Sequence, residues 1–233
     1  MVKQIKKELQ HLADPDRAKI LQKFFKTGKG QYGEGDVFLG ITVPEQRKVA
    51  KKYSGLTLKE LQGLLSSRYH EHRLTTLLIL VIKYTKSDES EKKEIADFYF
   101  KNTNHINNWD LVDVSADKII GDYLLERDRQ ILYELVRSEN LWERRIAVMS
   151  TFNFIRNNDF KDTLKMSVLL LRDKHDLIHK AVGWMLREIG KRNLSVEEAF
   201  LKKHYKNMPR TMLRYAIEKF DQDRRRTYLK NLV

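Results

Sequence analysis

The apolar residues of this chain recur every three or four positions along nearly its whole length. Stretches such as "TLKELQGLL", "EIADFYF", "RQILYELV" and "EEAFLKKHY" follow this spacing and begin near a polar residue, which is typical of amphipathic helices. Thr57 with Glu60, and Ser195 with Glu198, match the capping-box pattern that starts a helix. We find no convincing alternation of strand residues. The pattern predicts an all-α protein.

A longer repeat of about 35 residues groups these helices into pairs. Five apolar helices align on one position each, at intervals of 36, 36, 35 and 34 residues; these anchors are Arg73, Trp109, Arg145, Lys180 and Arg214. An amphipathic helix and a short polar turn precede each anchor. Helix pairs at this period stack into an α-solenoid, because one pair cannot cover its own apolar face. We expect a single domain over residues 1–233, with repeats at about 56–220 and less regular helices at 1–55.

The register of the repeats suggests where the anchors lie. Each anchor precedes the apolar residues of its helix, so we expect it near the helix start on the less buried side. Stacking would then align the five anchors, four of them basic, along one concave face. Such a row suits the phosphates of a DNA duplex. For any single residue, capping a neighbouring helix or pairing with an acid is an equally good interpretation.

The composition supports a polyanionic partner and narrows the chemistry. Lys and Arg outnumber Asp and Glu by 45 to 32, for a net charge of +13, which attracts polyanions over a long range; the alternative is a merely solvated basic surface. There is no cysteine, so thiolate chemistry is excluded, and the histidine spacings do not favour a metal site. The first ten residues contain no apolar core of the kind that a signal peptide carries, so we expect none, and the longest apolar run, 77–82, is too short to span a bilayer. We expect a cytoplasmic protein without a membrane anchor.

Half of the ten glycines fall in the segment 28–40, "GKGQYGEGDVFLG". The segment lacks the spacing of a phosphate-binding loop, and we expect it to be flexible. It is either a mobile edge that closes over nucleic acid or, more economically, a plain linker.

The stretch "NNWDLVD" at 107–113 carries the candidate chemistry. Trp109 and Asp113 stand four residues apart and therefore share one helix face. Trp184 follows its anchor by four residues, as Asp113 does, and Arg145 belongs to the repeat between them. On a concave surface these four side chains would converge. The alternative is that the indoles are core residues, which is our preferred interpretation for Trp142, placed in a turn.

Five segments together resemble a known family. "FLGITVPEQRK", "NNWDLVD", "GDYL", "NLWERRIA" and "KAVGWMLREIGK" are similar in order and spacing to the AlkD-type DNA alkylation repair glycosylases, built from HEAT-like repeats. The resemblance covers about residues 15–220. It implies excision of cationic N3- and N7-alkylated purines, such as 3-methyladenine and 7-methylguanine, from duplex DNA by a monofunctional enzyme that grips the backbone from an open face.

The resemblance also implies roles for particular residues. Asp113 corresponds to the catalytic acid, and Trp109 and Trp184 to the flanking indoles. The residues expected to contact DNA are Arg145, Arg187, Lys180, Arg73, Arg214, Arg47 and Phe24. Phe24 stands where the family has a tyrosine, and Thr42-Val43 replaces a polar pair before a proline, so the DNA contacts of the first helices are expected to differ.

A single carboxylate is chemically sufficient for this reaction. An N3- or N7-alkylated purine is already cationic and leaves readily, so the enzyme must mainly stabilise positive charge on the sugar and supply water, whereas neutral glycosides need two carboxyl groups. No cofactor is expected, and a monomer, associated with the nucleoid when bound to DNA, is the default. The main alternative is a non-catalytic HEAT-repeat binder of damaged or branched DNA; a protein-interaction scaffold fits the basic charge less well.

Overall fold

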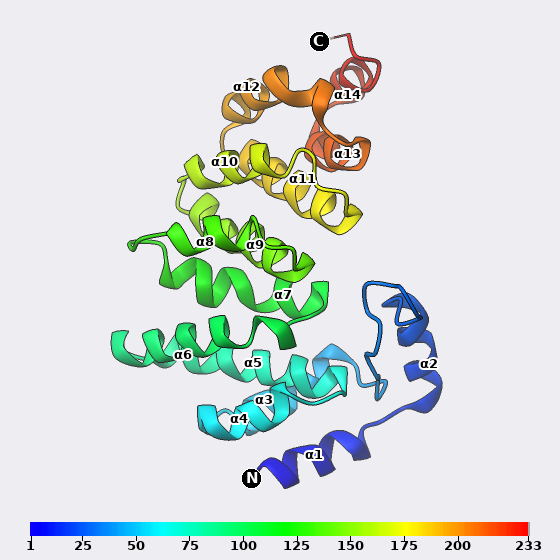
Figure 1. Ribbon diagram of the computed structural model, residues 1–233, viewed down its shortest axis with the longest axis vertical. Coiled ribbons are helices and arrows are strands. Elements are labelled where there is room, and N and C mark those ends of the chain that lie inside the picture. The colour runs from blue at the N-terminus through cyan, green and yellow to red at the C-terminus, as the bar shows by residue number, and fades with distance from the viewer. Residues whose placement is uncertain (233) are drawn as a thin grey trace. The chain divides into compact units, whose positions relative to one another are not determined.

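The computed structural model describes residues 1–232 and, within them, confirms the all-α fold of stacked helix pairs (Figure 1). One isolated bridge, between Val37 and Tyr69, is the extended pairing found in these residues. The chain divides into two compact units, Met1–Tyr123 and the part from Leu124 onward. The expectation of a single domain stays a prediction.

In the first unit, α5 is the central helix. Most of its residues are buried, and it packs against α3, α4, α6 and α7. The α-helices of this unit are α1 (Val2–His11), α2 (Pro15–Phe24), α3 (Val43–Lys52), α4 (Leu58–Leu65), α5 (His70–Lys86), α6 (Glu89–Lys101) and α7 (Trp109–Ala116). A 3-10 turn (Thr103–His105) precedes α7, and a π-helical turn (Asp117–Gly121) extends it. Because α5 is surrounded by other helices, it anchors the segments that carry the candidate site.

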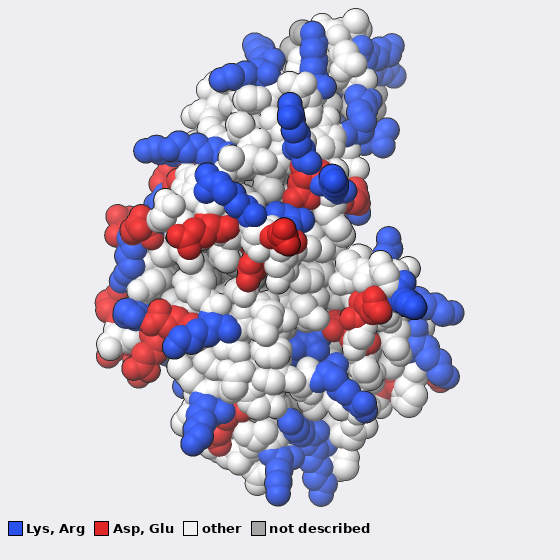
Figure 2. Space-filling model, in the orientation of Figure 1, with Lys and Arg blue, Asp and Glu red and all other residues white. Residues whose placement is uncertain are grey.

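The second unit has α11 at its centre. It packs between α9 and α13, with α10 and α12 also against it. The α-helices of this unit are α8 (Gln130–Leu135), α9 (Leu141–Arg156), α10 (Lys161–Leu169), α11 (Asp176–Gly190), α12 (Leu194–His204), α13 (Arg210–Ala216) and α14 (Gln222–Leu229); 3-10 turns follow α12 (Tyr205–Asn207) and α13 (Ile217–Lys219). In Figure 2, Lys and Arg side chains crowd the visible face of its C-terminal helices. None of the helices described is long and apolar enough to cross a membrane.

The predicted repeat register is largely confirmed. Each of the five anchors falls within the first five residues of α5, α7, α9, α11 or α13. The expected exposure is wrong for two of them: Arg73 and Arg145 are only 3% and 5% exposed. Both are buried because they bond to groups within their own units. A row of five accessible anchors therefore does not exist.

The helix starts were predicted with mixed success. The Thr57–Glu60 capping box is confirmed. The Ser195–Glu198 box is wrong, because α12 begins at Leu194 and its N-cap, two residues before Ser195, is Asn193, which accepts a hydrogen bond from the Val196 N–H. Trp142 is buried as expected, although it lies in the first turn of α9 rather than in the preceding turn.

The glycine-rich segment is not a free linker. Residues 28–34 close on themselves, with the Gly30 N–H bonded to Glu34 Oε2 at 2.7 Å and the Gly33 N–H to Lys26 O at 3.1 Å. Asp36 and residues 39–41 are bonded to side chains in the first turn of α5. The segment is thus an ordered strap against the helix pair, and the prediction of a flexible linker is wrong for 36–40.

Candidate active site

The accessible face of α7 carries the candidate chemistry. Trp109 and Asp113 are both half-buried and lie one turn apart on this short helix. The opposite face buries Leu111, Val112, Ser115 and Ala116. The four-residue spacing therefore does place the ring and the carboxylate on one side of the helix, as predicted, with neither sequestered in the core.

Trp109 belongs to a column of rings. Its indole stacks on Phe25, with centroids 5.1 Å apart and planes at 14°, and Phe25 stacks on Phe38 at 4.9 Å. Phe38 in turn stacks on the imidazole of His70 at 4.4 Å. Phe24, at the end of α2, is 62% exposed and meets the indole edge-on at 6.1 Å. The column holds Trp109 from one side and leaves Phe24 open to a ligand.

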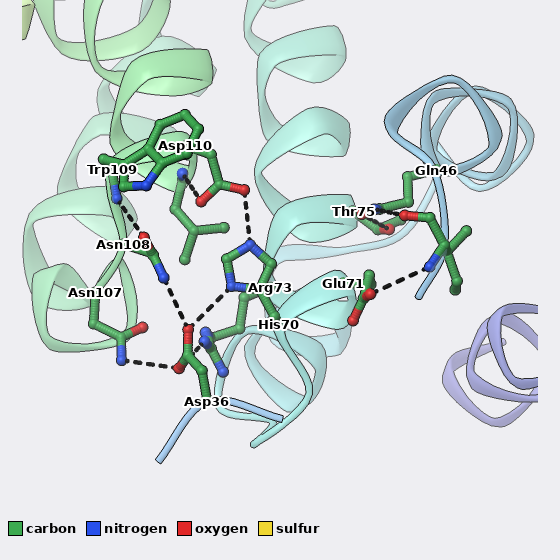
Figure 3. Close-up of polar contacts among 12 residues, drawn as sticks. Asp36, Gln46, His70, Glu71, Arg73, Thr75, Asn107, Asn108, Trp109 and Asp110 are labelled. Atoms are coloured by element: carbon green, nitrogen blue, oxygen red, sulfur yellow. Dashed lines mark hydrogen bonds and ion pairs between the residues drawn. The ribbon is translucent and has the colours of Figure 1, made fainter. Parts of the chain in front are cut away.

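Asp36 is the meeting point of a buried polar network beside this column (Figure 3). One carboxylate oxygen pairs with Arg73 at 2.5 Å, and the other faces His70 Nδ1 at 3.1 Å. Asn108 donates its side-chain amide to Asp36 at 3.2 Å and accepts the Trp109 N–H at 2.9 Å. Asn108 thereby caps α7 and ties its start to the glycine-rich strap. Asn107 adds a weak contact at 3.4 Å.

His70 joins the network to α7. Its Nε2 lies 2.8 Å from Asp110 Oδ2, while its Nδ1 faces Asp36. Burial opposes a charged imidazole, but the Asp110 and Asp36 carboxylates outweigh it and raise the pKa of His70 to about 9. Burial also opposes ionisation of Asp36, yet hydrogen bonding from His70 and the charge of Arg73 hold the pKa of that carboxyl below its usual value. At neutral pH the ring is an imidazolium between two carboxylates.

A second buried carboxylate fixes the other end of the strap. Glu71 is 1% exposed and accepts the backbone N–H groups of Leu39, Gly40 and Ile41 at 2.8, 2.8 and 3.3 Å. Three such bonds compensate the cost of burying the charge. Phe38 lies between Asp36 and these three residues in the strap, and it is therefore held against His70 by the bonds on either side of it in the sequence.

A largely apolar pocket of about 280 Å³ opens beside the ring column. Arg17 lines it from α2, and Val43 and Gln46 line it from α3, with His70 and Asp110 also on its wall. Val43 is 40% exposed. The pocket therefore joins Phe24 to the charged network.

The candidate residues of the second unit lie on α9, α11 and α13. Trp184 is half-buried, and its Nε1 donates to Glu188 Oε1 at 3.2 Å. Glu188 is itself held by Lys191 and Arg192 at 2.6 and 3.3 Å. The indole is thus fixed by an acid one turn further along α11, which leaves part of its surface accessible.

The predicted DNA-contacting cations are not equally available. Arg145 donates to Leu177 O at 2.6 Å, Lys180 pairs with Asp176 at 2.8 Å, and Arg187 pairs with Glu218. Arg214 is exposed. In the first unit, Arg47 is exposed on α3, whereas Arg73 pairs with Asp36 and also donates to Ser67 O at 2.8 Å. Arg73 and Arg145 therefore have clear structural roles.

The sequence interpretation missed the network around His70. Only Trp109 and Asp113 of the stretch 107–113 were predicted to act in the site, and the histidines were considered only as metal ligands. A polar pair before a tryptophan, followed by an acid, is an available signal for a capped helix start. Asp36, the key partner, lies too far away in sequence for spacing to reveal.

Solved structures with a similar fold include a protein described in terms of DNA alkylation repair. The chain resembles a predicted DNA alkylation repair enzyme from Enterococcus faecalis (18% identity, 90% of this chain and 97% of that one, TM-score 0.70). It also resembles AlkD2 from Streptococcus mutans (20% identity, 89% and 99%, TM-score 0.56) and smu.31 from Streptococcus mutans UA159 (19% identity, 89% and 98%, TM-score 0.54). The comparison with curated proteins found no match.

The family model described as "DNA alkylation repair enzyme" matches residues 5–220, nearly the whole chain and both units. Membership supports a role in the repair of alkylated DNA, with DNA as the partner. The chain belongs to the DNA alkylation repair enzyme family.

Proposed function

We propose that this protein is a DNA glycosylase that hydrolyses the N-glycosidic bond of N3- and N7-alkylated purines in duplex DNA. The observation that carries the proposal is the shared accessible face of Trp109 and Asp113 on α7. A half-buried carboxylate beside an indole is suited to a cationic substrate. A surface that only binds DNA would gain affinity by losing that negative charge.

The chemistry follows from the charge of the substrate. When the C1′–N9 bond breaks, its electron pair neutralises the alkylated purine, which leaves as a neutral base, and positive charge grows on the sugar. The Asp113 carboxylate stabilises that charge and orients a water, whose oxygen bonds to C1′ and whose proton passes to the carboxylate or to solvent. A preorganised group of this kind contributes roughly 3 to 4 kcal/mol, by analogy with single oxyanion-hole donors.

The indoles complement the carboxylate. Trp109 is fixed by the ring column, so its face is presented without an ordering cost at the time of binding. Indole faces attract cations by about 0.5 to 2 kcal/mol, which suits both the lesion and the developing sugar cation. Trp184, fixed by Glu188, is proposed to supply a second indole to bound DNA. The exposed Arg47 and Arg214 are proposed to contact phosphates. Lys180, paired with Asp176, and Arg187, paired with Glu218, are proposed to contribute as well.

The test is release of free base. Duplex DNA carrying 7-methylguanine or 3-methyladenine is incubated with purified protein, and the soluble products are separated by chromatography. Asp113→Asn should reduce release of 7-methylguanine by a hundredfold or more, consistent with losing about 3 to 4 kcal/mol, while DNA affinity changes little. Asp97→Asn is the matched control, because Asp97 is a half-exposed helical carboxylate paired with Lys93.

The outcomes separate the alternatives. Release that disappears in Asp113→Asn but persists in Asp97→Asn supports the glycosylase. Salt-sensitive binding of DNA by wild-type protein without any release indicates a non-catalytic binder. Undiminished release by Asp113→Asn removes that residue from the catalytic role.

A further inference from the structure

Trp109 and His70 are linked by two independent routes. Through space, the rings run from Trp109 to Phe25, Phe38 and His70, with successive centroids 5.1, 4.9 and 4.4 Å apart. Through hydrogen bonds, His70 holds Asp110, the residue next to Trp109, at 2.8 Å. Both routes begin at His70 and end in the first turn of α7.

We propose that His70 is a positioning residue for Trp109: by gripping Asp110 and Asp36 at once, it locks the first turn of α7 and the glycine-rich strap into the geometry that presents the indole to DNA. This inference rests on the proposed function, in which Trp109 contacts the damaged nucleotide. It assigns Asp36, His70 and Asp110 to the site although none of them is proposed to touch substrate.

The ring must donate from both nitrogens to fill this role. Nδ1 faces Asp36 and Nε2 faces Asp110, so a neutral imidazole, with one N–H, can serve only one carboxylate. Arg73 supplies the second positive charge, against Asp36. The two carboxylates are thereby matched by two cations. Glu71 and Arg17 also lie on the pocket wall near the ring, and Glu71 is occupied by the strap's backbone.

We call His70, held between Asp36 and Asp110, the clamp. It needs both carboxylates because they come from different segments. Asp36 comes from the segment that carries Phe38, and Asp110 comes from α7. Removing either bond would free one side of the ring column, either the side that supports Phe25 or the helix turn that carries the indole. A displacement of about 1 Å at such a site costs on the order of a hundredfold in rate.

A merely structural histidine would stabilise the unit without coupling to the indole, and the test distinguishes the two. The indole N–H resonance of Trp109 is followed by nuclear magnetic resonance, assigned by its loss in Trp109→Phe, and the His70 ring nitrogens are followed in the same samples. In wild type, both His70 nitrogens should remain protonated at pH 7.5. The Trp109 signal should move, with a midpoint near pH 9, as the imidazolium is lost.

Four variants complete the design: two single variants, their double variant and one control. His70→Gln and Asp110→Asn should each shift the Trp109 signal at pH 7.5, abolish its movement near pH 9, and slow single-turnover excision ten- to a hundredfold at saturating protein, with DNA affinity within threefold. The double variant should cost about as much as either single one, because both break one clamp. His72→Gln is the matched control: His72 is buried on the same helix but bonds to Ser67, and its replacement should leave the Trp109 signal in place.

The results decide between the two proposals. A Trp109 signal and an excision rate unchanged in folded His70→Gln and Asp110→Asn would overturn the inference while leaving the glycosylase intact. Shifted Trp109 signals in the two single variants, together with a wild-type protein that releases no base, would support the positioning role of His70 and overturn the proposed function. If His70→Gln does not fold, Asp110→Asn, at a side chain 14% exposed, decides the question together with the wild-type titration.

Discussion

The Phe25 ring lies nearly parallel to the indole of Trp109, with centroids 5.1 Å apart, while the adjacent Phe24 meets the same indole edge-on. Two consecutive phenylalanines therefore contact one tryptophan in different ways. Phe25 is 6% exposed and supports it from within, whereas Phe24 is 62% exposed and faces outward. This difference predicts that Phe25 supports the site and that Phe24 contacts DNA.

Phe25→Ala should lower the free energy of unfolding by about 3 to 5 kcal/mol, the usual cost of removing a buried phenylalanine. It should also slow excision, because the indole loses its support. Phe24→Ala should change stability by about 0.5 kcal/mol or less and weaken DNA binding. Urea titrations and fluorescence anisotropy with labelled duplex measure the two effects. Equal stability losses in both variants would contradict the division of roles.

Arg145 and Arg214 occupy the same predicted repeat position but differ in burial. Arg145 is 5% exposed and bonded to Leu177 O, so Arg145→Ala should cost about 2 to 4 kcal/mol of stability. If Arg145 also contacts DNA, as expected from the sequence, the variant should lose DNA affinity as well. Arg214→Ala should leave stability almost unchanged and reduce the slope of log affinity against log salt by about 1. Binding titrations at several salt concentrations, beside urea titrations, test both. Full affinity and an unchanged salt slope in Arg145→Ala would remove it from the DNA contacts.

Gly183 allows α11 to approach α13. A Cβ at this position would lie 2.4 Å from Met212 O and 2.6 Å from Tyr215 Cβ, so Gly183→Ala must push the helices apart. We expect a loss of about 1 to 3 kcal/mol and a change in the environment of the neighbouring Trp184. Gly63→Ala is the control, since nothing lies within 4 Å of its Cβ in α4. It should stabilise the protein by up to about 1 kcal/mol. Similar melting temperatures for the two variants would show that the close approach is unimportant.

The sequence predicted the helix pairs well because the signal is local. Apolar spacing of three and four residues is set by the turn of a helix, and the near-35-residue period by the need to cover one face of each pair. Anchors such as Lys180 and Arg214 consequently fall near the helix starts that the period indicates. The shared face of Trp109 and Asp113 was predictable for the same reason, because it depends only on their four-residue separation within one helix.

Burial of charge was not predictable in this way. Arg73 and Arg145 look like their exposed counterparts in the alignment of repeats, and only a partner elsewhere distinguishes them. For Arg73 that partner is Asp36, at 2.5 Å across the fold; for Arg145 it is the carbonyl of Leu177. Long-range pairing of this kind leaves no periodic trace, so the His70 network, which depends on Asp36, was also invisible.

Glu197 provides a test of buried charge outside the site. It is 2% exposed, and its Oε1 has no hydrogen-bond partner among residues 1–232. Burial, aided by the negative charge of Glu198 and opposed by Arg187, raises the pKa of Glu197 to about 8. Because the native pKa lies above the unfolded value near 4.5, the native state holds a proton that the unfolded state releases between these values. Stability should therefore fall by up to about 1.4 kcal/mol per pH unit across that range.

Glu197→Gln removes the titrating proton while keeping the shape of the side chain. It should match wild type at pH 4.5 and exceed it at pH 8 and above, when compared by urea titration at several pH values. Glu198→Gln is the control, because Glu198 is more exposed and pairs with Arg224 at 3.0 Å; its replacement should leave most of the wild-type pH dependence in place. A Glu197→Gln protein that loses stability with pH as steeply as wild type would show that Glu197 is already ionised in the native state, with its charge compensated by the surrounding helices.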